Sequence, residues 1–280
     1  MNYGDKGIKQ KKKLLNSATT KLGTKLGIFF IKLALVGIIA LVVAGSCLVF
    51  GSFQGIIENA PDIASINVSP EGFATKIYDS DENEIQTLSS AGANRTYVTI
   101  DQIPKDLQHA FIAIEDERFY EHNGIDMRGI LRAASITLSS GEMSQGASTI
   151  TQQLLKNNVF NAFNESTIEK IKRKVQEQYL AIKLETVMSK DSILENYLNT
   201  INLGNGYYGV QAAARGYFNK DVSELSISEC AVIASITKSP TGLNPIRHAD
   251  RNKDRQSQVL LNMKAVSYTH LRAHETVLDL

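Results

Sequence analysis

The feature that most constrains this chain is an apolar stretch at residues 33–50, which contains no charged side chain. A helix needs about 20 such residues to cross the hydrocarbon core of a bilayer, and the apolar character here extends back to Gly27. The segment before Leu33 holds eight lysines and one aspartate, a net charge of +7, which leaves −6 for the rest of the chain. Lysines on one side only predict an uncleaved single-pass anchor in the cytoplasmic membrane, with the N-terminus inside and the following residues outside.

Other interpretations of this segment stay open. A cleaved signal peptide has a shorter apolar core, of about 7–15 residues. The stretch 44–47 weakly resembles a lipoprotein cleavage site but lacks a leucine three residues before Cys47. A buried core helix would not need the lysine cluster. A basic tail is also typical of nucleic-acid binding, but its position beside the apolar segment favours anionic lipid, and we expect no nucleic-acid partner.

Beyond the anchor, the patterns predict one mostly α-helical domain. We expect a basic cytoplasmic tail at 1–32, the anchor at 33–50, a linker at 51–73, the domain at 74–263 and an off-pattern tail at 264–280. Two β-prone runs, 75–79 and 84–88, predict a hairpin around 81–83. Helices are expected at 106–116, 127–138, 149–158, 166–187, 191–200, 210–218, 226–237 and 251–263. Capping boxes mark the starts at Ser166 and Ser226, and no cysteine or histidine spacing indicates a zinc site.

The helix at 166–187 has the clearest pattern. Its apolar side chains recur every three to four positions and predict one buried stripe, made of Ile168, Ile171, Val175, Tyr179, Ile182 and Thr186. Arg173 and Lys174 lie four and three residues before Glu177, so the three share a face. This arrangement fits intrahelical ion pairing, and it fits equally a carboxylate held beside cations that bind an anionic leaving group.

Two earlier segments carry polar groups suited to chemistry. EDERFYEHNGID, at 115–126, places acids and a histidine at the end of an apolar helix. Burial there can raise a carboxyl pKa into a useful range, although acids at a helix end more often form a solvated cap. GASTITQQLLKN, at 146–157, places a face of amides, hydroxyls and one ammonium on a helix, which suits a sugar phosphate as well as it suits solvent. The glycines at 204–209 predict a tight turn, with no G-K-[ST] to indicate a nucleotide loop.

Five segments resemble, in order, the signature motifs of the family 51 glycosyltransferases. They lie at 115–126, 146–157, 173–185, 193–218 and 225–245, and the last reads LSISECAVIASITKSPTGLNP. That family comprises the peptidoglycan glycosyltransferase domains of class A penicillin-binding proteins and the monofunctional transglycosylases. The resemblance covers about residues 70–263. It implies a lysozyme-like helical domain with a small second lobe. It also implies an inverting β-1,4 transfer that polymerises lipid II and releases undecaprenyl pyrophosphate.

The resemblance assigns roles residue by residue. Glu115 matches the general base, and Glu177 matches the second essential carboxylate. Substrate contacts are implied at Asp116, Phe119, His122, Ser148, Thr149, Gln152, Gln153, Lys156 and Arg173. The implied partners are lipid II, the nascent glycan strand, the membrane, and cell-wall synthesis or division proteins. A pyrophosphate leaving group needs positive charge, from Lys, from Arg or from a divalent cation such as Mg²⁺ or Mn²⁺.

Some features depart from that pattern. Ala147 stands where the family commonly has glycine. The run at 235–238 matches S-x-x-K of transpeptidases, but neither K-T-G nor S-D-N follows, so we interpret it as a coincidence. The tail from Val266 resembles translated adapter sequence, and we expect the natural gene to continue beyond it. The rival functions are a lysozyme-like murein hydrolase and a non-catalytic cell-wall scaffold. Cations beside Glu177 favour the transferase, because hydrolysis has no pyrophosphate to stabilise.

Overall fold

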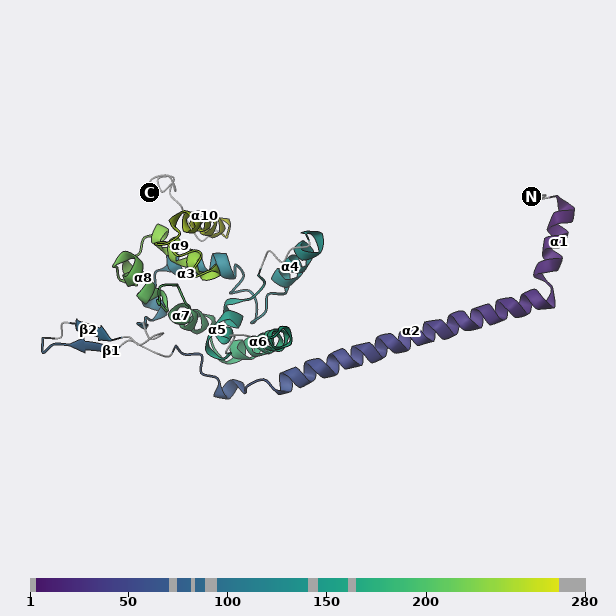
Figure 1. Cartoon of the computed structure of the whole chain (residues 1–280), viewed down its shortest axis with the longest axis horizontal. Helices are drawn as coiled ribbons and strands as arrows, with labels where there is room; N and C mark the ends of the chain where they lie inside the picture. The colour runs from purple at the N-terminus through teal and green to yellow at the C-terminus, as the bar shows by residue number, and fades with distance from the viewer. Residues whose placement is uncertain are drawn as a thin grey trace. The chain divides into compact units, whose positions relative to one another are not determined.

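The computed structural model describes residues 4–70, 75–81, 84–88, 95–140, 146–160 and 165–266. Its contacts divide the chain into two compact units, residues 1–59 and residues 60–280. Figure 1 shows the elements of both units with their labels. Each unit is described by itself below.

The first unit consists of two helices, α1 (Asp5–Leu15) and α2 (Ala18–Glu58). The hydroxyl of Ser17 caps α2 by accepting a hydrogen bond from the Thr20 amide. Within Leu22–Ser65 an 18-residue window has a mean hydropathy of 2.8, and none of that window is buried. At 1.5 Å per residue α2 is about 60 Å long, twice the thickness of a hydrocarbon core. It therefore extends past both ends of the predicted anchor and takes in residues 51–58 of the predicted linker.

The second unit begins with short elements. These are η1 (Ile63–Ser65), an antiparallel hairpin of β1 (Thr75–Tyr78) and β2 (Glu84–Leu88), and η2 (Ile100–Gln102). Thr75 pairs with Leu88, and a register shift follows Ile77. The predicted hairpin is confirmed, while residues 82–83 of its expected turn lie outside the described residues.

The remainder of the second unit is helical. It comprises α3 (Lys105–Glu115), α4 (Met127–Ser140), α5 (Ile150–Asn158), α6 (Thr167–Val187), α7 (Lys190–Thr200), α8 (Val210–Phe218), η3 (Val222–Glu224), α9 (Ile227–Ser235), η4 (Ile236–Lys238) and α10 (Ala249–Ala265). Helices α3, α9 and α10 contact one another, and α5 contacts both α6 and α7 (Figure 1). The predicted mostly α-helical fold, preceded by one N-terminal apolar helix, is confirmed. Both predicted capping boxes are present, at Ser166 with Glu169 and at Ser226 with Glu229.

Aromatic side chains join the two helix groups at the core. Phe111 of α3 and Tyr197 of α7 are fully buried and meet edge to face, with ring centroids 6.0 Å apart. Phe119, just after α3, is also fully buried. The end of α3, where Glu115 lies, is therefore at the junction of the two groups.

The prediction for the buried face of α6 is wrong. Ile168, Ile171 and Ile182 of the predicted stripe are exposed, and the buried side chains are Glu177, Leu180, Ala181 and Leu184. The buried face of this helix therefore consists of one ion-paired carboxylate and the apolar residues that come after it. Periodicity alone missed this, because a charged residue scores as surface unless its partners are known.

Candidate active site

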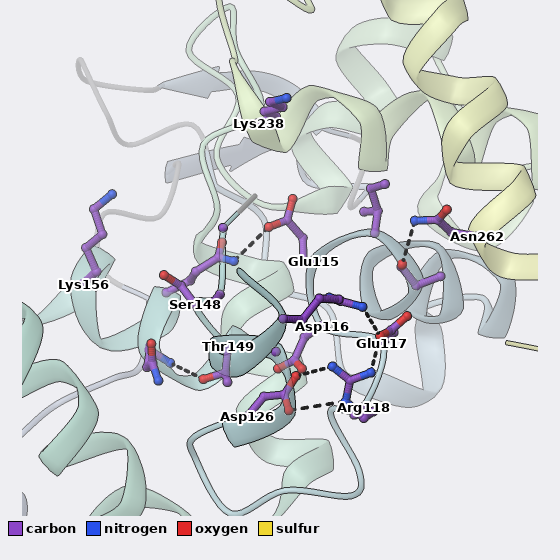
Figure 2. A pocket seen from close by; sticks show the side chains of 18 of the residues that line it. Glu115, Asp116, Glu117, Arg118, Asp126, Ser148, Thr149, Lys156, Lys238 and Asn262 are labelled. Atoms are coloured by element: carbon purple, nitrogen blue, oxygen red, sulfur yellow. Dashed lines mark hydrogen bonds and ion pairs between the residues drawn. The ribbon is translucent and has the colours of Figure 1, made fainter. Parts of the chain in front are cut away.

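A polar cavity of about 890 Å³ opens beside the C-terminal end of α3. Its walls come from the end of α3 and the segment after it, from α4, from α5 and the segment before it, and from α6, η4 and α10. Figure 2 shows Glu115, Ser148 and Lys156 among its lining residues. The ion-paired group of Glu117, Arg118 and Asp126 lies on another part of the wall. Both predicted carboxylates, Glu115 and Glu177, line this one cavity.

Glu115 is the last residue of α3, and neutral donors surround its carboxylate. The amide Nε2 of Gln153, from α5, donates to Oε2 at 2.8 Å. The hydroxyl of Thr237, from η4, lies 2.5 Å from Oε1. The hydroxyl of Tyr197 in turn donates to Oε1 of Gln153 at 3.1 Å. Burial, then the nearby charges of Glu115 and Asp116, raises the pKa of Tyr197 well above its ordinary value, so this hydroxyl stays a donor.

Asp116 fixes the start of α5 against the segment that follows α3. Its buried carboxylate accepts the Ile150 amide at 3.0 Å and Nε2 of His122 at 3.0 Å from both oxygens. The hydroxyl of Thr149 donates to the carbonyl of Gly124 at 2.8 Å. Gly124 has φ +82°, and a Cβ there would lie 2.5 Å from the carbonyl carbon of Ala181. These contacts set where the polar face of α5 lies.

Glu177 of α6 is fully buried, and two cations compensate its charge. Arg173 and Lys174 both form ion pairs with it, the second at 3.0 Å. Arg173 also contacts Glu165 at 2.8 Å. The Nζ of Lys174 donates to the Ser148 hydroxyl at 2.7 Å, which ties α6 to the segment before α5. The burial of Arg173 alone would lower its pKa, but the hydrogen bond to Glu165, the largest effect, and the pairing with Glu177 raise it, so it stays charged.

The cavity carries a surplus of positive charge. Seven basic and five acidic side chains line it, a formal balance of +2. Three of the cations, Lys156, Lys238 and Arg255, have no carboxylate partner in the part of the chain that the structure describes. Buried Nε of Arg255 also lacks a hydrogen-bond partner there. Unpaired cations in a concave site favour an anionic ligand.

A separate ion-paired group forms another part of the wall. Arg118 pairs with Glu117 and, at 2.6 Å, with Asp126, while Arg132 approaches Glu117 at 2.8 Å. Burial alone would raise the pKa of Asp126, but hydrogen bonds from Arg118 and from the Gly129 amide outweigh it and lower that pKa. These carboxylates are engaged with cations, whereas Glu115 accepts from the neutral Gln153 amide and Thr237 hydroxyl.

The cavity carboxylates do not form a metal site of their own. Among the described residues, no group of three His, Cys, Asp or Glu side chains is placed to hold an ion. Glu177 and Asp126 face cations at hydrogen-bond distance, and Asp116 faces an amide and a ring nitrogen. This donor set does not fit a metal ion held by the protein alone.

Most residues predicted for the site come together in this cavity. Nine of the eleven line it: Glu115, Asp116, Ser148, Thr149, Gln152, Gln153, Lys156, Arg173 and Glu177. The other two, Phe119 and His122, lie behind it, the first in the core and the second against Asp116. Sequence reasoning gave no site role to Thr237, Tyr197, Lys238 or Arg255. Thr237 and Lys238 lie in the fifth motif and Tyr197 in the fourth, which was the one available signal for these three.

Comparison with known proteins agrees with this architecture. A family model described as Transglycosylase matches residues 81–264. Penicillin-binding protein 1A of Escherichia coli is 42% identical over 239 residues, covering 85% of this chain and 27% of that protein. Penicillin-binding protein 1F of Bacillus subtilis is 44% identical over 195 residues, covering 70% and 26%. A solved penicillin-binding protein 1A from Haemophilus influenzae aligns at 24% identity with a TM-score of 0.37, over 71% of this chain and 19% of that one, and carries no further argument.

The family model and these relatives identify a glycosyltransferase domain, and an N-terminal apolar helix precedes it in the sequence. The chain belongs to the transglycosylase family, the peptidoglycan glycosyltransferases. It spans about a quarter of the length of the curated relatives it matches.

Proposed function

We propose that this domain polymerises lipid II into glycan strands by inverting β-1,4 transfer, with undecaprenyl pyrophosphate as the leaving group. The observation that carries the proposal is the single cavity shared by Glu115, with its neutral donors, and Glu177, with its paired cations. A base for a sugar hydroxyl and positive charge for a diphosphate are the two requirements of such a transfer.

In this proposal Glu115 takes the proton from the 4-hydroxyl of the acceptor sugar. The hydroxyl oxygen attacks C1 of the donor sugar from the face opposite the diphosphate. The C1–O bond to the diphosphate breaks, and the diphosphate leaves with the electron pair. Lys156, which has no carboxylate partner among the described residues, would bind that anion, and the charge of Lys174 on the cavity wall would stabilise it.

Glu177 has a positioning part in the same scheme. It is buried and bonded to both Arg173 and Lys174, so it fixes these cations at the cavity wall. Ser148 and Gln152 lie within 3.4 Å of the Lys174 Nζ and direct it further. Fixed charges need no reorganisation when the leaving group develops its charge.

A divalent cation at the pyrophosphate is part of the proposal. Since the protein donor set does not fit an ion, the diphosphate oxygens would supply its ligands, and the ion would add positive charge to that of the lysines. We propose further that the N-terminal helix anchors the enzyme with its N-terminus inside and this domain outside, in keeping with the lysines before Leu33.

The test is incubation of the full-length chain, in detergent, with labelled lipid II, followed by separation of polymer on a gel, with Mg²⁺ or with EDTA. Glu115→Gln should abolish polymer and keep the fold, because the amide accepts no proton at neutral pH. EDTA should lower the rate if an ion assists the leaving group. Release of fragments from isolated cell wall, without polymer from lipid II, would favour the hydrolase instead.

A further inference from the structure

The two carboxylate oxygens of Glu115 face groups with different capacities. Oε2 accepts from the amide of Gln153 at 2.8 Å. Oε1 lies 2.5 Å from the hydroxyl of Thr237. An amide NH₂ can only donate, whereas a hydroxyl can donate or accept. The two oxygens are therefore unequal as places for a proton.

The Gln153 amide is held in one orientation. Its Oε1 accepts from the hydroxyl of Tyr197 at 3.1 Å, and Tyr197 is fully buried. The NH₂ group must then point towards Glu115, as the 2.8 Å contact shows. A protonated Oε2 would accept more weakly from this donor, so protonated Glu115 favours its proton on Oε1, opposite Thr237.

Thr237 has a second acceptor within reach. Its hydroxyl lies 2.9 Å from the carbonyl of Ala234, three residues earlier in the chain. The hydroxyl has one hydrogen and two acceptors, the Glu115 carboxylate and this carbonyl. When Glu115 is ionised, the hydrogen is best placed towards the carboxylate. When Glu115 is protonated, the hydrogen can turn to Ala234, and the oxygen can then accept from Glu115.

We propose that Thr237 is a positioning residue that holds Glu115 in both of its protonation states during the transfer. The inference rests on the proposed function. Before the reaction the hydroxyl donates to Oε1 and aims the carboxylate. As the acceptor oxygen bonds to C1 and the diphosphate leaves with its electron pair, the acceptor proton passes to Oε1. Thr237 then accepts from that new O–H while donating to Ala234, and the proton later leaves to solvent.

Several charged groups border this arrangement. Asp116 follows Glu115 directly, Tyr197 of α7 donates to Gln153 beside it, and Lys238 and Lys156 line the same cavity from η4 and α5. None of them contacts the Thr237 hydroxyl at hydrogen-bond distance among the described residues. Removal of that hydroxyl therefore changes one hydrogen bond to the base and leaves the surrounding charges in place.

The experiment compares Thr237→Val, which keeps the shape, with Thr237→Ser, which keeps the hydroxyl. Exposed Thr241, which does not line the cavity, supplies the matched control Thr241→Val. The full-length chain in detergent is assayed with labelled lipid II for kcat and KM across pH 5 to 9, with melting temperatures measured in parallel. Glu115→Gln serves as the inactive reference.

Thr237→Val should lower kcat about tenfold or more, with little change in KM, since the carboxylate is no longer aimed and its protonated form loses the acceptor that Thr237 provides. The acidic limb of its pH profile should move up by about one unit, because the lost bond favoured the ionised base. Thr237→Ser should resemble the wild type in both respects. A wild-type kcat for Thr237→Val would overturn the inference. So would a Thr237→Ser variant with as low a kcat as Thr237→Val and an unshifted pH profile. If the wild-type chain forms no polymer, the proposed function fails and this inference fails with it.

Discussion

Asp116→Asn tests how the site is held together, because the two carboxylate oxygens of Asp116 satisfy donors from two segments. The Ile150 amide and Nε2 of His122 both approach at 3.0 Å, and the carboxylate is almost completely buried. Asparagine offers one acceptor oxygen, so one of these donors meets an NH₂ group. If His122 changes tautomer to accept from that group, its Nδ1 carries the hydrogen, and Nδ1 is buried with no partner in the described residues.

Either arrangement leaves one buried donor unsatisfied and removes a bond to a charged acceptor. We expect a loss of about 2–3 kcal/mol in the free energy of unfolding. For a unit of roughly 200 residues this lowers the melting temperature by about 4–12 °C. The polymer yield should fall as well, because the Ile150 contact fixes the start of α5, which carries Gln152 and Gln153 into the cavity.

The assay is thermal unfolding of the full-length chain in detergent, followed by circular dichroism at 222 nm, since the protein has no tryptophan to report it. Asp254→Asn is the matched control, because Asp254 is exposed on α10 and has no hydrogen-bond partner among the described side chains. A melting temperature for Asp116→Asn within about 1 °C of that control would refute the argument that these hydrogen bonds hold α5.

Two further predictions concern the segment after α3. Gly124→Ala should destabilise the protein by about 3 kcal/mol or more. The alanine would have to adopt a left-handed conformation, and its Cβ would lie 2.5 Å from the backbone of Ala181. The control Gly146→Ala, with open space at its Cβ, should have the melting temperature of the wild type. Asp126 has a lowered pKa, so its stabilising effect is complete above its ordinary value of 3.8 and is lost as pH falls through the lower folded value. The melting temperatures of wild type and Asp126→Asn should therefore approach each other as the pH falls below 3.8. A constant gap would contradict the pairing with Arg118.

The positions of the helices could be predicted from the sequence because they follow from local signals. The capping boxes at Ser166 and Ser226 and the glycine turn near Gly204 act within a few residues, and the predicted helix boundaries of the second unit lie within about two residues of the observed ones. The anchor is the exception, since α2 extends well past both of its predicted ends. Glu115 and Glu177 were also predicted from local motifs. Their meeting in one cavity was implied by the family resemblance rather than by the pattern.

The remainder depended on contacts between distant segments. Thr237 lies 122 residues from Glu115 in the chain, and nothing in its surroundings marks its hydroxyl as a partner of the base. The buried face of α6 was mispredicted for a related reason. Glu177 is buried because Arg173 and Lys174 pair with it, and a hydrophobic pattern does not count ion pairs as burial.

The apolar side chains that α4 and α6 leave uncovered have a practical consequence. Leu138 is 88% exposed, Leu131 66% and Ile168 67%, and all three belong to the second unit rather than to the N-terminal helices. Cutting the chain before Ala60 would therefore remove the long helix without producing a fully water-compatible protein. Such a fragment would keep these side chains in contact with water, so a mild surfactant should improve its recovery during purification and crystallisation.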